Sequence, residues 1–318
     1  MKKIVISTLL ATTLLLSNSS ANNSSINSTS KIVESYEKLA SQGEIEAMFN
    51  LGLIYLTGDG AKQDYTKAKE WFLKAVSKNN DTMSAYNLAL IYKNGLGVPK
   101  NDKEAYKYFL IAANKNYAQA QYMLGNMIEK GQGAKKDLKE AFSWFLKAAQ
   151  QGHILSEYRV GKMYRLGEGV AKNDTEAKKW YELSANKGNA FAQANLGVMY
   201  KQGIATKQDY KEAFNWFEKS ANQKNVLGQL NLALMYQNGL GVEKNSKEAF
   251  NLYKIASDEG NSASAQYNLG LMYLKGDGIE KNIDKTIEYW IKSSEQGFEV
   301  AKNSLEKLCK ESSNSCKK

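Results

Sequence analysis

One glycine position recurs along this chain every 36 or 37 residues. Each copy lies between two segments whose apolar residues follow helical spacing, and the loop that joins them usually reads Gly-x-Gly. A fixed period in this range is typical of solenoids of stacked helix pairs, because one pair cannot bury its apolar face alone. The sequence therefore predicts an all-α solenoid of about seven full repeats within 43–297. The recurring glycines are Gly58, Gly95, Gly131, Gly167, Gly203, Gly239 and Gly276.

The unit SEYRVGKMYRLGEGVAKNDTEAKKWYELSANKG, residues 156–188, shows how each repeat begins and ends its helices. Gly167 predicts the stop of the first helix, and Asn173 followed by Glu176 predicts an N-cap with a capping-box acid for the second. We expect N-cap residues also at Asp64, Asn101, Asp137, Asp209, Asn245 and Asn282, and five of the seven caps have Glu three positions on. The fifth repeat reads Gly203-Ile204-Ala205 in place of Gly-x-Gly, which predicts a distorted turn.

Two further columns of residues have packing roles. A small residue in each first helix should let the two helices of a repeat approach closely, and the Trp column of the second helices is interpreted as structural. The small residues are Gly52, Ala89, Gly125, Gly161, Gly197, Ala233 and Gly270, and the tryptophans are Trp71, Trp144, Trp180 and Trp216, with Trp290 shifted by one.

Atypical helices are expected at both ends of the solenoid, since terminal repeats must cover its core. KIVESYEKLASQG, 31–43, predicts an N-terminal capping helix, and FEVAKNSLEKLCK, 298–310, predicts a C-terminal one. The solenoid is thus predicted over 31–310, with a tail at 311–318. Cys309 and Cys316 are the only cysteines, and we expect them to form a local disulfide in an oxidising compartment.

The N-terminal segment resembles a secretory signal peptide. Met1-Lys2-Lys3 precedes an apolar run that is too short for a membrane span, followed by small residues up to Ala21. We predict a signal peptide at 1–21 and a disordered Asn/Ser-rich tether at 22–30. The mature chain is expected to be a monomer without membrane insertion, exported to a bacterial periplasm or secreted.

The chain carries 43 basic and 33 acidic residues, a formal net charge of +10. Almost all the basic residues are lysines, and Arg159 and Arg165 are the only arginines. Proteins that read nucleic acids rely on arginine for bidentate contacts to guanine and phosphate. Scattered lysines among acids on helix surfaces favour a solvated exterior, so we predict no nucleic-acid partner.

Two stretches carry a family resemblance: AMFNLGLIYLTGDGAKQDYTKAKEWFLKAV (47–76) and AQYMLGNMIEKGQGAKKDLKEAFSWFLKAAQQG (120–152). They resemble the Sel1-like repeat, a relative of the tetratricopeptide repeat, and the resemblance extends over roughly 43–297. It implies a right-handed α-solenoid that acts as a non-catalytic scaffold or adaptor for protein partners. Several exported bacterial members of the family engage other proteins at the cell envelope or in a host.

Enzymatic chemistry finds little support in the motifs. His153, the only histidine, has nothing in sequence to orient it, and no P-loop, HExxH, zinc-finger or EF-hand pattern occurs. We therefore predict no catalytic residues, no metal site and no cofactor. Ser184–Lys187 and Ser304–Lys307 match S-x-x-K without the supporting motifs of serine β-lactamases.

Two alternatives to a scaffold stay open. One is a weak β-lactamase or penicillin-binding hydrolase, by resemblance to the cysteine-rich Sel1-like proteins of Helicobacter. Those proteins carry a cysteine pair in each repeat, whereas residues 43–297 contain no cysteine here. The other is an immunity or inhibitor protein that masks a toxin.

The candidate partner-binding residues come from the first helices, which line the concave groove in tetratricopeptide-like solenoids. One column is rich in asparagine, whose amide can donate and accept at once, and the preceding column is rich in tyrosine. We predict a protein or peptide ligand in this groove, although asparagine is also common throughout the chain. The columns comprise Asn50, Asn87, Asn195, Asn231 and Asn268, and Tyr86, Tyr122 and Tyr158.

The fourth repeat departs from these columns. Arg159, Lys162 and Arg165 stand at i, i+3 and i+6, so they share one side of a helix where other copies carry Asn and Leu. A cationic middle between apolar flanks favours a ligand with an acidic side chain. The competing interpretation is an ordinary solvated helix face.

Overall fold

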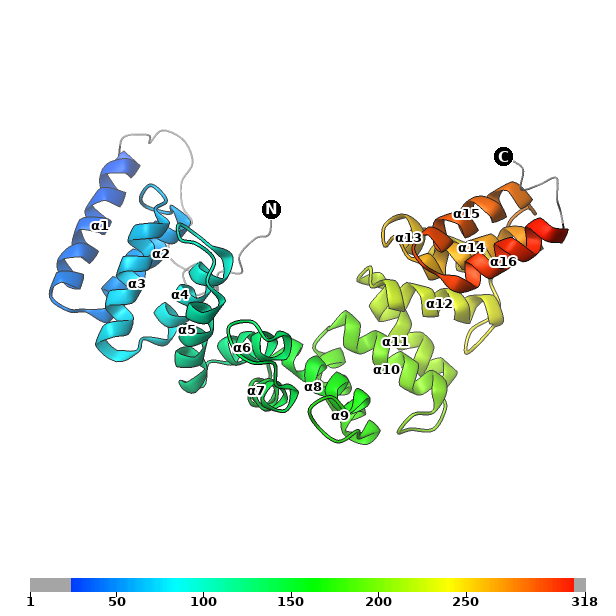
Figure 1. Cartoon of the computed structure of the whole chain (residues 1–318), viewed down its shortest axis with the longest axis horizontal. Helices are drawn as coiled ribbons and strands as arrows, with labels where there is room; N and C mark the ends of the chain where they lie inside the picture. The colour runs from blue at the N-terminus through cyan, green and yellow to red at the C-terminus, as the bar shows by residue number, and fades with distance from the viewer. Residues whose placement is uncertain (1–23, 312–318) are drawn as a thin grey trace. The chain divides into compact units, whose positions relative to one another are not determined.

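The computed structural model describes residues 24–311, and all the regular structure in that range is helical (Figure 1). The first five helices are α1 (Ser24–Ser41), α2 (Ile45–Thr57), α3 (Tyr65–Asn79), α4 (Thr82–Asn94) and α5 (Asp102–Asn114). They are followed by α6 (Ala118–Lys130), α7 (Leu138–Gln150), α8 (Ile154–Leu166), α9 (Asp174–Asn186), α10 (Ala190–Gln202) and α11 (Tyr210–Asn222). The last five are α12 (Val226–Asn238), α13 (Ser246–Asp258), α14 (Ala263–Lys275), α15 (Ile283–Glu295) and α16 (Glu299–Glu311).

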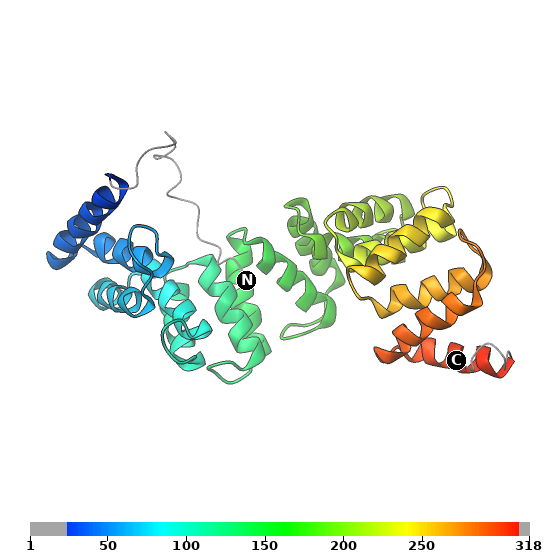
Figure 2. The ribbon, with the colours of Figure 1, turned by 90° about the horizontal axis from the view of Figure 1, so that it is seen from above.

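The chain divides into two compact units. The first runs to Ala112 and the second begins at Ala113, within the last turns of α5. In the second unit the first helix of each repeat packs on the second helix, and the second helix packs on the first helix of the next repeat (Figure 2). This stacking confirms the predicted all-α solenoid.

The predicted helix ends are confirmed. Gly167 closes α8 in the left-handed conformation, with φ of 74°, and its N–H donates to the carbonyl of Met163. The Asn173 side chain caps α9 by accepting from the backbone N–H of Glu176 at 3.0 Å. The same glycine closes every first helix, because only a residue without Cβ takes positive φ at no steric cost.

The turn of the fifth repeat is not distorted, so that prediction is wrong. Ala205 takes the left-handed φ of 54° at the position where Gly169 has 71° and Gly241 has 69°. The strain falls on the alanine, since an L-residue in this region costs about 1–2 kcal/mol. The flanking helix caps hold the backbone in the common geometry, and one residue absorbs the mismatch.

The close approach of the two helices in each repeat is confirmed at the small-residue column. A Cβ added to Gly161 would lie 2.8 Å from Cδ1 of Tyr181. Gly125 and Gly197 face Phe145 and Phe217 in the same way. The buried aromatic of each second helix is thus the residue after the predicted Trp column.

The tryptophans of the column are less deeply buried than these aromatics: Trp71, Trp180 and Trp216 are half-buried, and Trp144 is 7 % exposed. The rings of Trp71, Trp144 and Trp216 each lie beneath the ammonium of the lysine three residues later, at 3.8, 4.0 and 4.2 Å. Trp290, which is shifted by one, is the exception: it is 3 % exposed and fills the place of the buried aromatic against Gly270. The shift of Trp290 in the sequence therefore has a structural reason.

Both capping helices are present, with one change at the N-terminus. Helix α1 begins at Ser24, so the backbone from Ser24 to Ser30 is helical where a disordered tether was expected. Extending an existing helix adds one hydrogen bond per residue, which lets it run into a stretch of weak helix formers. At the other end α16 follows the predicted range within one residue.

Some predictions fall outside the described residues. The signal peptide at 1–21 and most of the tail at 311–318 lie there, and so does Cys316. The Cys309–Cys316 disulfide therefore stays a prediction. In residues 24–311 no helix is both long enough and apolar enough to cross a bilayer.

Candidate functional site

The candidate site is one face of the first helices in the second unit. Residues at i, i+4, i+7 and i+11 of a helix share a face, and we call this face of α8, α10 and α12 the first-helix stripe. Its members on α8 are Leu155, Arg159, Lys162 and Leu166; on α10, Phe191, Asn195, Val198 and Gln202; and on α12, Leu227, Asn231, Leu234 and Asn238.

The two arginines are held by carboxylates of the protein itself. Arg159 pairs with Glu129 of α6, and its guanidinium lies 5.2 Å from the ring centre of Phe145. Arg165 pairs with Asp174 at the start of α9, with Nη1 3.1 Å from Oδ1. These pairs join neighbouring helices, so the arginines are largely neutralised in place. The predicted cationic cluster of Arg159, Lys162 and Arg165 is not brought together as a free surface.

Two lysines of this region lack a carboxylate partner among the described residues. Lys162 is half-buried on α8. Lys201 of α10 is also half-buried; its Nζ donates to Oδ1 of Asn231 at 2.6 Å and lies 5.7 Å from the ring centre of Phe217. Burial lowers the pKa of Lys201 from its usual 10.5, because its charge is only partly solvated. Lys201 was not identified as a site residue from the sequence. A signal was present, because Lys201 lies 30 residues before Asn231, the same interval that separates Glu129 from its partner Arg159.

The asparagines of the predicted column are fixed by their own helices. Nδ2 of Asn195 donates to the carbonyl of Phe191 at 2.7 Å, and Asn231 and Asn268 make the same bond four residues back at 2.9 Å. In the first unit Asn87 does so as well, at 2.9 Å, while Asn50 lies half-buried on α2. In the partly exposed Asn87, Asn195 and Asn268, one amide hydrogen is thus used internally and the second is left to donate to a ligand, whereas Asn231 is buried.

The predicted tyrosine column packs against the second helices. Tyr86 lies edge-on to Phe109, with ring centres 5.6 Å apart, and Tyr122 contacts Phe145 and His153 at 5.8 and 4.9 Å. Tyr158 lies 6.0 Å from Tyr181 and 5.8 Å from Phe191 of the next repeat. Burial raises the pKa of Tyr158 above 10.0. All three tyrosines stay partly exposed, so each contributes to the interior and to the surface.

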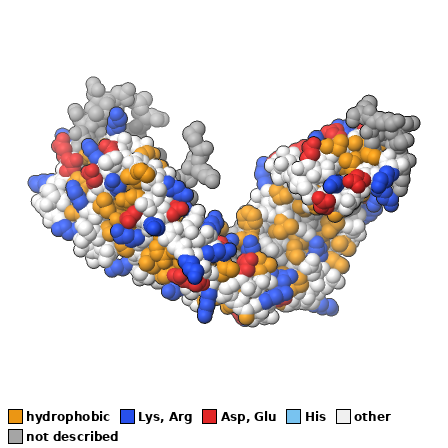
Figure 3. All heavy atoms as spheres, viewed as in Figure 1, with side chains coloured by type: hydrophobic (Ala, Val, Ile, Leu, Met, Phe, Trp, Pro, Cys, Tyr) orange, Lys and Arg blue, Asp and Glu red, His pale blue; other side chains and the backbone are white. Residues whose placement is uncertain are grey.

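Apolar side chains reach the solvent at one register of three consecutive first helices. Leu155 is 44 % exposed, Phe191 57 % and Leu227 41 %. Each comes four residues before the Arg159, Asn195 or Asn231 position of its helix. Hydrophobic side chains are visible at the surface over the region of α10 to α12 in Figure 3. An exposed apolar row rimmed by polar residues is typical of a protein-interaction site.

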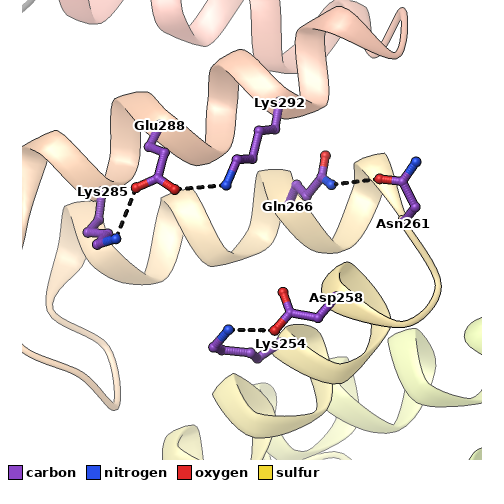
Figure 4. Close-up of polar contacts among 7 residues, drawn as sticks. All are labelled: Lys254, Asp258, Asn261, Gln266, Lys285, Glu288 and Lys292. Carbon is purple, nitrogen blue, oxygen red and sulfur yellow. Dashed lines mark hydrogen bonds and ion pairs between the residues drawn. The ribbon is translucent and has the colours of Figure 1, made fainter.

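A buried pair of glutamine side chains joins neighbouring repeats, and in the fourth repeat a Glu–Lys pair takes its place. Gln193 donates to the carbonyl of Ala185 at 3.1 Å and accepts from Nε2 of Gln223 at 2.8 Å. In the seventh repeat Gln266 occupies the same place and donates to Oδ1 of Asn261 at 3.3 Å (Figure 4). The fourth repeat substitutes Glu157, 2 % exposed, paired with Lys187.

The side chains that motif analysis singled out for chemistry have structural roles. Ser184 is fully buried, and its hydroxyl donates to the carbonyl of Ile154 at 2.8 Å, as Ser220 does to Ala190. His153 is the N-cap of α8, where Nδ1 accepts from the backbone N–H of Ser156. Among the described side chains no group of three or more His, Cys, Asp or Glu is placed to hold a metal ion.

Comparisons with known proteins agree with the repeat architecture. The Sel1 repeat family model matches residues 45–80, 82–117, 118–153, 154–189, 190–225, 226–261 and 263–298. A comparison with curated proteins found no match. The repeat boundaries match the helix pairs seen in the structure.

Three solved structures illustrate the range of similarity. The protective antigen c5321 of uropathogenic Escherichia coli, which has an SLR fold, is 34 % identical with a TM-score of 0.77; the match covers 87 % of this chain and 59 % of that chain. A Sel1 repeat protein from Oxalobacter formigenes is 26 % identical with a TM-score of 0.70, covering 89 % and 81 %. The immunity protein Pa5087 from Pseudomonas aeruginosa is 20 % identical with a TM-score of 0.39, covering 66 % and 80 %, a likeness too small to support a function.

The chain therefore spans about three fifths of the length of c5321. Sel1 repeat proteins typically mediate protein–protein interactions, and their scaffolds are generally non-catalytic. With seven matched repeats and the stacked helix pairs of the second unit, this chain belongs to the Sel1 repeat family.

Proposed function

We propose that this protein is a non-catalytic interaction scaffold that binds a segment of another protein along the first-helix stripe. The observation that carries the proposal is the row of exposed Leu155, Phe191 and Leu227 at one register of three consecutive helices. Isolated exposed apolar residues are ordinary, whereas a repeated row is typical of a binding surface.

The asparagine column supports the same function. The partly exposed amide of Asn195 is oriented by a bond to its own helix, so little side-chain freedom is lost when a ligand binds. It lies one turn from Phe191. Apolar contact beside oriented polar groups is a common composition of protein interfaces.

Site-specific photo-cross-linking in the native cell tests this proposal. A photoreactive phenylalanine analogue at Val198, in the stripe, should form a cross-linked species with a partner polypeptide. The same analogue at Lys211, which is exposed on the second helix α11, is the matched control. Cross-links of equal yield from both positions, or from Lys211 alone, would refute binding along the stripe.

We also propose that the protein acts in the bacterial cell envelope or outside the cell. The basic start at Lys2 and Lys3, the apolar run and the small residues before Asn22 support export. The test is the intact mass of the protein recovered from cell fractions. Cleavage after Ala21 is expected, and an uncleaved chain confined to the cytoplasm would contradict the proposal.

A further inference from the structure

Charge is unevenly divided between the two helix layers of the second unit. Among the described residues, the five first helices α6, α8, α10, α12 and α14 carry six cations and two acids. The five second helices carry 10 cations and 11 acids. The first-helix layer is thus net cationic by four, while the second-helix layer is nearly neutral.

The acids of the first-helix layer offset little of this charge at the stripe. Glu129 is paired with Arg159, and Glu157 is buried and paired with Lys187, the residue that follows α9. Lys162 and Lys201 therefore have no carboxylate within the described part of the chain to balance them. A surface with this imbalance attracts acidic partners and disfavours basic ones.

Lys201, which has no carboxylate partner among the described residues, lies close to Leu227 of the apolar row. Asn231 connects them, since its Nδ2 donates to the carbonyl of Leu227 and its Oδ1 accepts from Lys201. Tyr158 fills the space towards the preceding repeat, with its ring 5.8 Å from that of Phe191. A ligand that covers Leu227 thus lies one helical turn from Asn231, to which the Lys201 ammonium is bonded.

We propose that the first-helix stripe of α8, α10 and α12 binds an acidic amphipathic segment of a partner protein. Its apolar side chains cover Leu155, Phe191 and Leu227, and a carboxylate pairs with Lys201. This proposal rests on the proposed function and adds the chemistry of the partner.

The half-buried state of Lys201 favours this pairing. Its ammonium has already lost part of its hydration, and its pKa is lowered for that reason. A carboxylate delivered by the ligand would stabilise the charged form in a partly dehydrated place, where an ion pair is stronger than at an open surface. The amide of Asn231 offers only a partial negative charge.

The test uses the full mature chain and a displayed library of random peptides. Peptides retained by the protein are expected to be enriched in Asp or Glu together with Leu, Phe or Trp relative to the input library. For a selected peptide made by synthesis, Phe191→Ser and Lys201→Met should each raise Kd about tenfold or more, as loss of a central anchor does. Circular dichroism checks that both variants, changed at solvent-accessible side chains, keep their helices.

Matched controls come from the second helices. Leu183 of α9 is 46 % exposed and Lys211 of α11 is exposed, so Leu183→Ser and Lys211→Met should change Kd less than about twofold. Retained peptides without acidic enrichment, or a Kd insensitive to Lys201→Met, would overturn the acidic-partner proposal while leaving binding along the stripe intact. A Kd insensitive to Phe191→Ser, or no enrichment of any peptide, would overturn the proposed function as well.

Discussion

Replacing the buried carboxylate of Glu157 by an amide should stabilise this protein, even though the change removes an ion pair. Oε2 of Glu157 is buried and has no hydrogen-bond partner among the described residues, whereas Oε1 pairs with Lys187. At the equivalent place in other repeats, the Nε2 of Gln121 or Gln193 donates to a carbonyl eight residues earlier. A carboxylate cannot make that bond, so the fourth repeat lacks a contact that its neighbours have.

The balance of free energies favours the amide. A buried acceptor left without a partner costs about 1–3 kcal/mol, and a new bond from Nε2 to the carbonyl of Ala149 would contribute about 0.5–1.5 kcal/mol. The lost ion pair subtracts about 0–1 kcal/mol, because the Lys187 side chain is 38 % exposed. Glu157→Gln should therefore raise the free energy of unfolding, by about 0.5–4.5 kcal/mol.

Urea unfolding followed by circular dichroism at neutral pH measures this change. The midpoint should rise for Glu157→Gln at an unchanged m value. Lys187→Gln is the informative contrast, because it leaves the buried carboxylate without its cation and should lower stability by more than about 1 kcal/mol. The double variant recreates the Gln193–Gln223 arrangement and should be at least as stable as the wild type.

The opposite order of stabilities would refute this reasoning. If Glu157→Gln lowers the midpoint as much as Lys187→Gln does, the ion pair itself stabilises the joint. The unpartnered Oε2 would then be of little consequence. A lower midpoint for the double variant would show that the fourth repeat cannot accept the amide joint of its neighbours.

Three further predictions concern particular side chains. Ala205→Gly should raise the free energy of unfolding by about 1 kcal/mol, because glycine relieves the left-handed φ of 54°. Gly169→Ala should lower it by more than about 2 kcal/mol, because the new Cβ would lie 2.1 Å from the carbonyl oxygen of Leu138; equal effects of the two variants in urea unfolding would contradict the prediction. Burial lowers the pKa of His153 below its usual 6.5, so the unfolded chain binds the proton more readily and stability should fall as pH drops through about 6.5. His153→Asn copies the Asn189 cap and should remove that loss of stability. A urea midpoint with the same pH dependence in this variant as in the wild type would contradict the prediction. Mass spectrometry of the exported protein without reductant should show Cys309 linked to Cys316, and a free thiol at either position would disprove the bond.

The helix framework was predictable because local chemistry determines it. A glycine that ends a helix and an Asp or Asn that starts one act within a few residues, and the caps at Gly167 and Asn173 appear where the sequence predicts them. The turn at Ala205 was mispredicted for a related reason. The preference of alanine for negative φ predicted a distorted turn. The flanking helices instead keep the turn in the common geometry, and the cost is backbone strain at Ala205.

The candidate site was only partly predictable, because its contacts join residues that are 30 positions apart. Glu129 reaches Arg159, and Lys201 reaches Asn231, across the same interval between neighbouring first helices. No local pattern marks these pairs, and the helix face alone made Arg159 look free. The exposed Phe191 could have been noticed from its place one turn before Asn195, since that column holds glutamate, methionine, glutamine or serine in the first, second, third and seventh repeats.

Residues that bind a partner in a repeat protein should be those that its own repeats leave uncommitted. Arg159 and Arg165 differ most from the residues at the same positions in other repeats. Both form ion pairs with carboxylates of this chain, so they connect neighbouring helices rather than face a partner. Phe191 and Lys201 depart less visibly, but one is largely exposed and the other lacks a counter-charge among the described residues. Since binding energy comes from groups that gain contacts on association, these two residues carry more of the expected specificity than the two arginines.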